Sequence, residues 1–175
     1  AKGAGAIFNL AGVLGTDELN DPIAMRHAVE VNVQGALNCL QAARMQDIPI
    51  VQVCKPNIWL NTYTITKRAA EEFALLYAKE LGVKVWLPRW FNVFGPGQHY
   101  GEPKKLAPTT IVKALRGEPI TIYGDGTQTV DHIYVKEAVS ATVAVVESDE
   151  LMGTPVDIGT GMDMSVNDFV FHVLN

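Results

Sequence analysis

The spacing of apolar residues predicts alternating strands and helices in the first part of the chain. Two short apolar runs, Ala6–Leu10 and Pro49–Cys54, have the length and composition of buried strands. Between them, residues Val29–Met45 place apolar side chains at helical intervals, and Asp21 followed by Pro22 is typical of a helix start. The pattern therefore predicts a strand, a helix and a second strand in this order.

A longer helix and a third strand follow. Residues Thr62–Leu81 are rich in helix-forming residues, and Gly82 is suited to close the helix in a left-handed conformation. The apolar run Val83–Leu87 predicts the next strand. Strands that alternate with helices predict a parallel sheet with right-handed crossovers.

The pattern changes after Gly95, where turn-forming residues are frequent and the expected elements are shorter. We expect a helix at Leu106–Leu115, with Pro108 in its first turn, and a helix at Lys136–Glu147. Short strands are expected at Ile120–Tyr123, Asp131–Val135 and Pro155–Ile158. These irregular elements predict a small lobe that leans on the carboxyl edge of the sheet, where open α/β sheets bind ligands.

Composition narrows the class of protein. The chain has 175 residues, of which 48% are hydrophobic and 19% are charged, as expected for a soluble globular protein with one core. The net charge of -5 argues against nucleic-acid binding, and no apolar run reaches the roughly 18 residues of a membrane helix. The cysteines, Cys39 and Cys54, form no disulfide framework, which favours a cytoplasmic location, and no metal-ligand spacing is present.

Tyr63 and Lys67 are the strongest candidates for chemistry. They lie four residues apart at the start of the predicted helix Thr62–Leu81, so both side chains share one face. A positive charge within about 6 Å of a phenol favours the phenolate and lowers its pKa from about 10. Such a tyrosine can exchange a proton with a sugar hydroxyl while a hydride leaves the same carbon. The alternative is a surface tyrosine that opens a helix near an ordinary lysine.

The order of these motifs resembles that of the NAD-dependent epimerase/dehydratase family, the extended short-chain dehydrogenases that act on nucleotide sugars. The resemblance covers nearly all of the chain, and its most specific part is the ten-residue segment Pro88–Gly97. The other matching segments are Asn9–Gly12, Val31–Gly35, Tyr63–Lys67, Ile120–Asp131, Tyr134–Val135 and Val156–Gly161. The resemblance implies an α/β fold, in which residues 1–93 form the C-terminal part of a Rossmann-like domain with a parallel sheet. It also implies that residues 94–175 form a small substrate-binding lobe, with a late strand returning to the sheet.

The resemblance also implies residue roles. Tyr63 would be the acid/base, and Lys67 would lower its pKa and bind the nicotinamide ribose of NAD or NADP. The implied cofactor-binding residues are Leu10, Ala11, Gly12, Asn32, Tyr63, Lys67 and Trp90, and the implied substrate-binding residues are Cys54, Asn92, Lys105, Leu106 and Tyr123. The alternatives are that Trp90 and Phe91 are core aromatic residues and that Asn32 is a core amide with satisfied hydrogen bonds.

The chain lacks the glycine-rich turn with which members of this family hold the dinucleotide pyrophosphate. Gly3-Ala4-Gly5 is not such a turn, because it precedes the first predicted strand and no helix follows it. We therefore expect that the chain is truncated and that, on its own, it binds a dinucleotide poorly or not at all.

Two further positions differ from the family pattern. Cys54 stands where the family has a serine or threonine, and a thiol is a weak donor, so Thr62 or Thr66 are the alternatives for that hydroxyl. The acidic pair of family dehydratases is also absent here, which favours epimerisation or simple oxidation and reduction. Val130 replaces an arginine that grips the substrate diphosphate, for which Arg89 and Arg116 are the alternatives.

The resemblance implies an NAD(P)-dependent nucleotide-sugar epimerase or oxidoreductase that uses hydride transfer and a Tyr/Lys proton relay. The alternative is a catalytically inactive, truncated family member that serves as a binding or scaffold domain. We also expect a homo-oligomer, because family members pair through the helices that match residues 29–45 and 66–79. A nucleotide sugar is the expected small-molecule partner.

Overall fold

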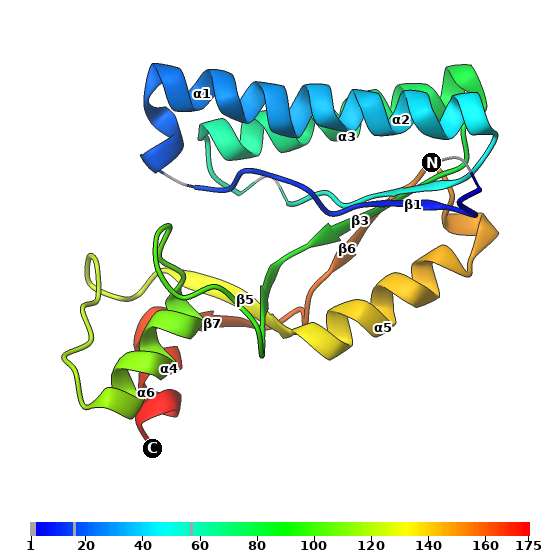
Figure 1. Cartoon of the computed structure of the whole chain (residues 1–175). Coiled ribbons are helices and arrows are strands. Elements are labelled where there is room, and N and C mark those ends of the chain that lie inside the picture. Colours follow the sequence, from blue (N-terminus) through cyan, green and yellow to red (C-terminus); the bar gives the residue numbers. More distant parts are fainter. Residues whose placement is uncertain (1–2, 16, 57) are drawn as a thin grey trace. The chain divides into compact units, whose positions relative to one another are not determined.

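The structure is a computed structural model that describes residues 3–15, 17–56 and 58–175. The chain divides into two compact units. Unit 1 comprises Ala1–Trp90 and Ala141–Ile158, and unit 2 comprises Phe91–Ser140 and Gly159–Asn175. Each unit has its own sheet (Figure 1).

Unit 1 contains a parallel sheet of four strands, which confirms the predicted fold class. The strands are β1 (Ile7–Asn9), β2 (Ile50–Gln52), β3 (Val85–Trp90) and β6 (Pro155–Ile158), in the spatial order β1-β2-β3-β6. Their parallel register pairs Ile7 with Ile50, Ile50 with Val85, and Leu87 with Pro155. All four carboxyl ends therefore lie at one edge of the sheet.

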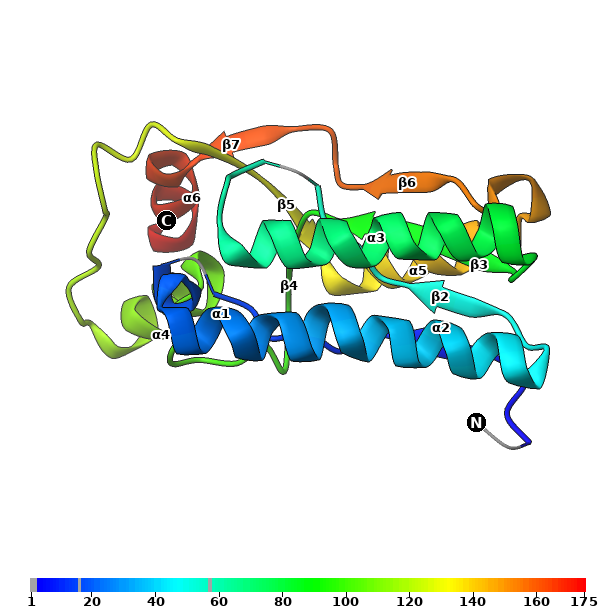
Figure 2. The same cartoon turned by 90° about the horizontal axis from the view of Figure 1, so that it is seen from above.

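Helices cover one face of this sheet (Figure 1). After the short helix η1 (Asp17–Asn20), α1 (Pro22–Ala28) continues through a π-helical stretch, η2 (Val29–Gln34), into α2 (Gly35–Gln46), and α3 (Thr62–Leu81) lies beside α2 (Figure 2). Asp21 caps α1, since its Oδ1 accepts hydrogen bonds from the amides of Ile23 and Ala24. Gly82 closes α3 with a φ of 67°, as its sequence position predicts.

The core of unit 1 lies between these helices and the sheet. Small and branched residues fill it, because the facing sides of α2 and α3 approach the strands closely. Its buried members are Leu40, Ala43, Ile50, Cys54, Ala74, Val83, Val85 and Leu87. Burial of this apolar surface is the main favourable term for unit 1.

Unit 2 is built on a smaller mixed sheet. Its strands are β4 (Asn92–Phe94), β5 (Thr129–Tyr134) and β7 (Asp163–Ser165), with β5 parallel to β4 and antiparallel to β7. Two helices, α4 (Leu106–Arg116) and α6 (Val166–Leu174), pack against each other in this unit. Helix α5 (Val135–Val146) runs from unit 2 into unit 1 and is followed by η3 (Asp149–Leu151).

One predicted element of unit 2 is wrong, and others were missed. Residues 120–123 form no strand, because no neighbouring strand pairs with them and an apolar run alone supplies no hydrogen-bond partner. The sequence analysis also did not anticipate β7 or α6. Both are held by the returning chain after β6, since Val166 N donates to Gln128 O and Thr129 pairs with Ser165.

Asp131 on β5 organises the turn that follows β6 within unit 2. Its carboxylate accepts hydrogen bonds from the amides of Thr160 and Gly161 and from the Thr160 hydroxyl, at 2.7–3.0 Å. A Cβ at Gly159 would lie 2.5 Å from Asp131 Oδ2, so only glycine allows this approach. The Asp131 side chain therefore has a structural role at this turn.

A buried ion pair joins α3 to β3 in unit 1. Arg89 Nε and Nη2 donate to the two oxygens of Glu71 at 2.9 and 2.5 Å, and Glu71 is 4% exposed. Both carboxylate oxygens are satisfied, which is the geometry in which a buried pair is best compensated. The hydrogen bond to Glu71 stabilises the charged form of Arg89 and is the main cause of its raised pKa.

We expect Glu71→Gln to lower the free energy of unfolding of unit 1 by about 2–3 kcal/mol, because it removes the buried countercharge of Arg89 and leaves only the exposed Asp157 carboxylate, 3.7 Å away, among its described ion pairs. Urea unfolding followed by circular dichroism measures this change. Glu72→Gln is the matched control, since Glu72 and Arg68 are both more than half exposed, and its effect should be within about 0.5 kcal/mol. Equal effects of the two variants would contradict the role assigned to Glu71.

Candidate functional site

Tyr63 lies in the first turn of α3, at the carboxyl edge of the unit 1 sheet. Asn61 caps this turn, because its Oδ1 accepts a hydrogen bond from the Thr64 amide at 2.8 Å. Tyr63 is half-buried, and burial raises the pKa of its phenol above the ordinary value. The cap thus fixes the backbone that presents the phenol.

Lys67, one helical turn further on, reaches the same strand end. Its Nζ donates to the carbonyl oxygen of Val53 at 2.6 Å, and the residue is 5% exposed. Burial lowers the pKa of Lys67, while the neighbouring Cys54 and Glu71 act in the opposite direction. Both residues therefore contact the segment Val53–Lys55, since the Tyr63 ring centroid lies 5.9 Å from Lys55 Nζ and Lys67 bonds to Val53.

The structure contradicts one expectation for this pair. The spacing of the pair predicts that Lys67 lowers the pKa of Tyr63, whereas the pKa of Tyr63 is raised. The physical reason is that burial of the phenol disfavours its charged form. The role of Tyr63 as an acid/base stays a prediction.

Asn32 connects three elements near this pair. Its Oδ1 accepts from the Val13 amide at 2.8 Å, and its Nδ2 donates to the Val13 carbonyl oxygen at 2.9 Å and to Thr66 Oγ1 at 3.0 Å. The residue is 3% exposed and lies within η2, where π-helical turns often mark functional positions. The side chain thus holds the segment after β1 against α3.

The segment that follows β1 is exposed to solvent. Leu10, Ala11 and Gly12 are all exposed, with Leu10 at 58%. A Cβ at Gly12 would lie 3.3 Å from Asn32 Oδ1, so a larger residue would press on the Asn32 contact. Their predicted role in cofactor binding stays a prediction.

Cys54, a predicted substrate-binding residue, lies in the interior of unit 1. Its thiol is 2% exposed, belongs to the core cluster of unit 1 and donates to the Gln52 carbonyl oxygen at 3.2 Å. Burial, followed by the charge of Glu71, raises the pKa of this thiol strongly. Its backbone pairs with β3 as a parallel bridge to Arg89. The predicted contact of Cys54 with a substrate stays a prediction.

Lys55 is a further member of the site that no sequence motif indicates. Its Nζ donates to Thr64 Oγ1 at 2.9 Å and lies 5.9 Å from the centroid of the Tyr63 ring. The available signal was a basic residue directly after the second strand, shortly before the tyrosine motif. Of the hydroxyls weighed as substitutes for the family serine, Thr66 is bonded to Asn32 and to the Thr62 carbonyl oxygen.

Trp90 ends β3 in unit 1 and is half-buried. Its indole Nε1 donates to Thr142 Oγ1 at 2.9 Å, so the polar edge of the ring is fixed by α5. This contact is structural, and the predicted place beside a nicotinamide stays a prediction.

The remaining predicted residues belong to unit 2. Asn92 is exposed, and its Nδ2 makes a long hydrogen bond of 3.4 Å to the Asp131 carbonyl oxygen. Lys105 and Leu106 lie at the start of α4 and are half-buried, while Tyr123 is 71% exposed. Their predicted contacts with a nucleotide stay predictions.

The arginines considered in place of Val130 are both engaged. Arg89 is held by Glu71. Arg116 lies 5.4 Å from the centroid of the Tyr100 ring and 3.8 Å from a Glu118 oxygen. Arg89 is therefore a structural residue of unit 1.

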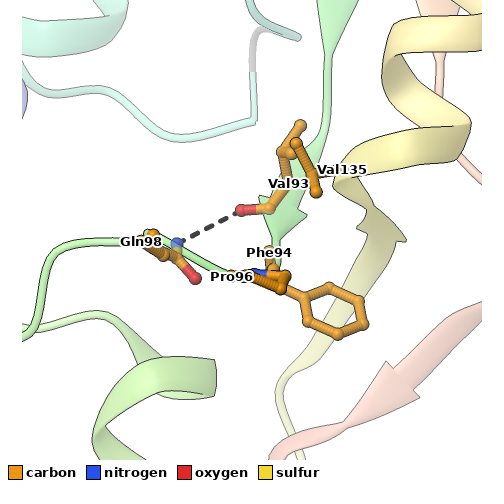
Figure 3. Close-up of a pocket in the computed structure, with 7 residues that line it drawn as sticks. Val93, Phe94, Pro96, Gln98 and Val135 are labelled. Atoms are coloured by element: carbon orange, nitrogen blue, oxygen red, sulfur yellow. Dashed lines mark hydrogen bonds between the residues drawn. The ribbon is translucent and has the colours of Figure 1, made fainter.

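A hollow in unit 2 follows β4, within the family-like segment (Figure 3). It has a volume of about 240 Å³ and is lined by Val93, Phe94, Gly95, Pro96, Gly97, Gln98 and Val135. Gln98 Nε2 donates to the Val93 carbonyl oxygen at 3.2 Å, which closes the turn. This lining has no ionisable side chain, so the hollow offers no acid/base chemistry.

Among the described residues, no group of three or more His, Cys, Asp or Glu side chains is placed to hold a metal ion. Among the described helices, none has both the length and the apolar character required to span a membrane.

Comparison with known sequences identifies relatives over most of the chain. Residues 59–159 match the sequence profile of the NAD dependent epimerase/dehydratase family. The chain is 36% identical over 107 residues to UDP-glucuronic acid decarboxylase 1 of Xenopus tropicalis, covering 61% of this chain and 25% of the relative. It is 27% identical over 183 residues to UDP-N-acetyl-alpha-D-glucosaminuronate decarboxylase of Bacillus cytotoxicus, covering 93% of this chain and 56% of the relative.

Solved structures give the same result for the fold. Pal from Bacillus thuringiensis matches 97% of this chain and 59% of its own with a TM-score of 0.89 and 26% identity. UDP-glucuronic acid 4-epimerase from Bacillus cereus, solved with UDP-glucuronic acid and NAD, matches 98% of this chain and 59% of its own with a TM-score of 0.89 and 23% identity. The chain thus spans between a quarter and three-fifths of the length of these proteins.

We expect Asn32→Ala to lower the free energy of unfolding of unit 1 by about 2–3 kcal/mol, because it leaves the Val13 amide and carbonyl without their buried partner. Hydrogen exchange at the Val13 amide should accelerate in parallel. Asn38→Ala is the matched control on α2, since Asn38 is exposed and bonded only to an exposed Gln34 among the described residues. Unchanged exchange at Val13 would contradict the anchoring role of Asn32.

Proposed function

Because the chain belongs to the NAD dependent epimerase/dehydratase family, we propose that it forms the catalytic-tyrosine part of an NAD(P)-dependent nucleotide-sugar epimerase or oxidoreductase. The observation that carries this proposal is that Tyr63 and Lys67 both contact the segment Val53–Lys55, at the carboxyl edge of a parallel sheet. In open α/β sheets, this edge is where ligands bind. The relatives that act on UDP-sugars support the same substrate class.

The residues of unit 1 fit the nicotinamide side of a dinucleotide. The exposed backbone of Leu10–Gly12 allows close approach, and Lys67 uses one of its three N–H donors on Val53 among its described contacts. Lys67 would therefore have donors for ribose hydroxyls, and Trp90 would lie nearby at the end of β3. The pyrophosphate side is not assigned, since Gly3-Ala4-Gly5 precedes β1 and is followed by no helix.

When bound, the nicotinamide supplies the acceptor and donor for a hydride. The chain's own contribution is the movement of a proton at Tyr63 Oη. As a base, Tyr63 accepts the proton of a sugar hydroxyl while the carbon is oxidised, and as an acid it returns that proton on reduction. Burial raises the pKa of the phenol, so the neutral phenol is the resting form, and nearby positive charge is needed to reach the phenolate.

The competing proposal, an inactive binding or scaffold domain, rests on Cys54, Val130 and the unassigned pyrophosphate side. The family match does not favour it.

We expect Tyr63→Phe to reduce turnover of a nucleotide sugar by about 100-fold or more, because it removes the group that carries the proton. The measurement is turnover of UDP- and dTDP-linked sugars with NAD by the protein that carries this sequence. Tyr77→Phe is the matched control, since Tyr77 is a half-buried tyrosine on the same helix, α3, and its Oη donates to Gln41. The proposal is wrong if activity is absent with every sugar tested, or if Tyr63→Phe retains the parent rate.

Assembly as a homo-oligomer through α2 and α3 is also part of the proposal. Both helices keep large apolar side chains at the surface, with Met45 71%, Ile65 55% and Leu76 49% exposed. The two free cysteines, Cys39 and Cys54, support the proposal of a cytoplasmic protein.

Analytical ultracentrifugation should therefore show a dimer or a larger species, and Leu76→Glu should shift it toward the monomer because a charge would be buried at the contact. Leu115→Glu is the control, since Leu115 is 83% exposed on α4 of unit 2. A parent chain that sediments as a monomer at high concentration would overturn this part of the proposal.

A further inference from the structure

Lys55 is a half-buried cation on the segment between β2 and α3. Its Nζ donates to Thr64 Oγ1 at 2.9 Å and to the Pro56 carbonyl oxygen at 2.5 Å. Two of the three ammonium donors are thus engaged by neighbouring residues. The position of the charge is set by these hydrogen bonds rather than by a freely rotating side chain.

The fixed ammonium lies at the ring of Tyr63. The distance from Lys55 Nζ to the ring centroid is 5.9 Å, within the range of a cation–π interaction. Among the ion pairs of the described residues, none involves Lys55, so no described carboxylate neutralises it. A phenolate ring carries more negative charge than a phenol ring, and the attraction to this cation is therefore stronger for the phenolate.

We propose that Lys55 is a positioning residue for Tyr63, whose ammonium acts together with that of Lys67 to favour the phenolate form during proton transfer. This inference rests on the proposed function in assigning the proton transfer to Tyr63. No bond to Lys55 forms or breaks: the phenol proton passes to the substrate oxygen or to water, and the ammonium keeps all three of its protons.

The other titratable groups on the elements packed here have partners of their own. Glu71 on α3 is held by Arg89 on β3, and the Cys54 thiol at the end of β2 donates to the Gln52 carbonyl oxygen. Lys67 donates to the Val53 carbonyl oxygen. Among the described contacts, the charge placed at the Tyr63 ring is that of Lys55.

The test is the titration of Tyr63 in the protein labelled with [ζ-13C]tyrosine, followed by NMR. The chain has five tyrosines, and the spectrum of Tyr63→Phe assigns the signal. We expect Lys55→Met to move the Tyr63 midpoint to higher pH, so that the phenolate fraction below the midpoint falls several-fold. Lys55→Arg should restore most of the effect because it keeps the charge. Lys79→Met changes an exposed lysine on α3, the helix that carries Tyr63, and should leave the Tyr63 midpoint as it is in the parent protein.

A second variant keeps the test decisive if Lys55→Met fails to fold. Thr64→Val removes the hydroxyl that fixes Lys55 Nζ while keeping the charge in the chain, and it should also raise the midpoint. The inference is overturned if the variants at positions 55 and 64 titrate like Lys79→Met. Since no substrate or cofactor is present, this result is independent of whether Tyr63→Phe abolishes turnover.

Discussion

The hydrogen bond from Lys67 Nζ to the Val53 carbonyl oxygen, at 2.6 Å, fixes helix α3 to the segment that follows β2. A buried ammonium is costly unless it has a partner, and Lys67 is 5% exposed. The carbonyl oxygen that it uses lies next to Cys54, at the end of β2. The first turns of α3, and Tyr63 with them, are therefore tied to the carboxyl edge of the sheet.

Two further polar contacts hold the same helix. Glu71, one turn beyond Lys67, receives two hydrogen bonds from Arg89 on β3. Thr66, beside Lys67, receives one from Asn32 on the π-helical stretch. Such groups are tolerated in the interior because each has a partner, and together they specify where α3 lies along β2 and β3. Apolar packing alone would fix the helix less closely, since the core residues of α3 and the sheet are small or branched.

This arrangement has a consequence for the chemistry of Tyr63. The same burial that orders the helix raises the pKa of the phenol, which opposes its use as a base. Positive charge is the means of offsetting burial, and the structure places Lys55 at the Tyr63 ring and Lys67 one helical turn beyond Tyr63. Lys67 lies on α3, and Lys55 lies on the loop that leads into this helix.

The sequence by itself determined the local elements of unit 1 and the residues of its motif. Helix α3 has the predicted bounds because Asn61 and Gly82 are strong local signals, and the parallel sheet follows from the alternation of elements. The pair Tyr63 and Lys67 followed from helical spacing, which depends only on backbone geometry.

The tertiary structure decided what depends on partners distant in the chain. The predicted strand at 120–123 is absent because no strand lies beside it, whereas β7 forms because β5 is there to pair with it. Cys54 lies in the core, Arg89 is hydrogen-bonded to Glu71, and Lys55 lies at the Tyr63 ring. Burial and partner choice are properties of the folded chain, so side-chain pKa values and contacts cannot be read from residue spacing alone.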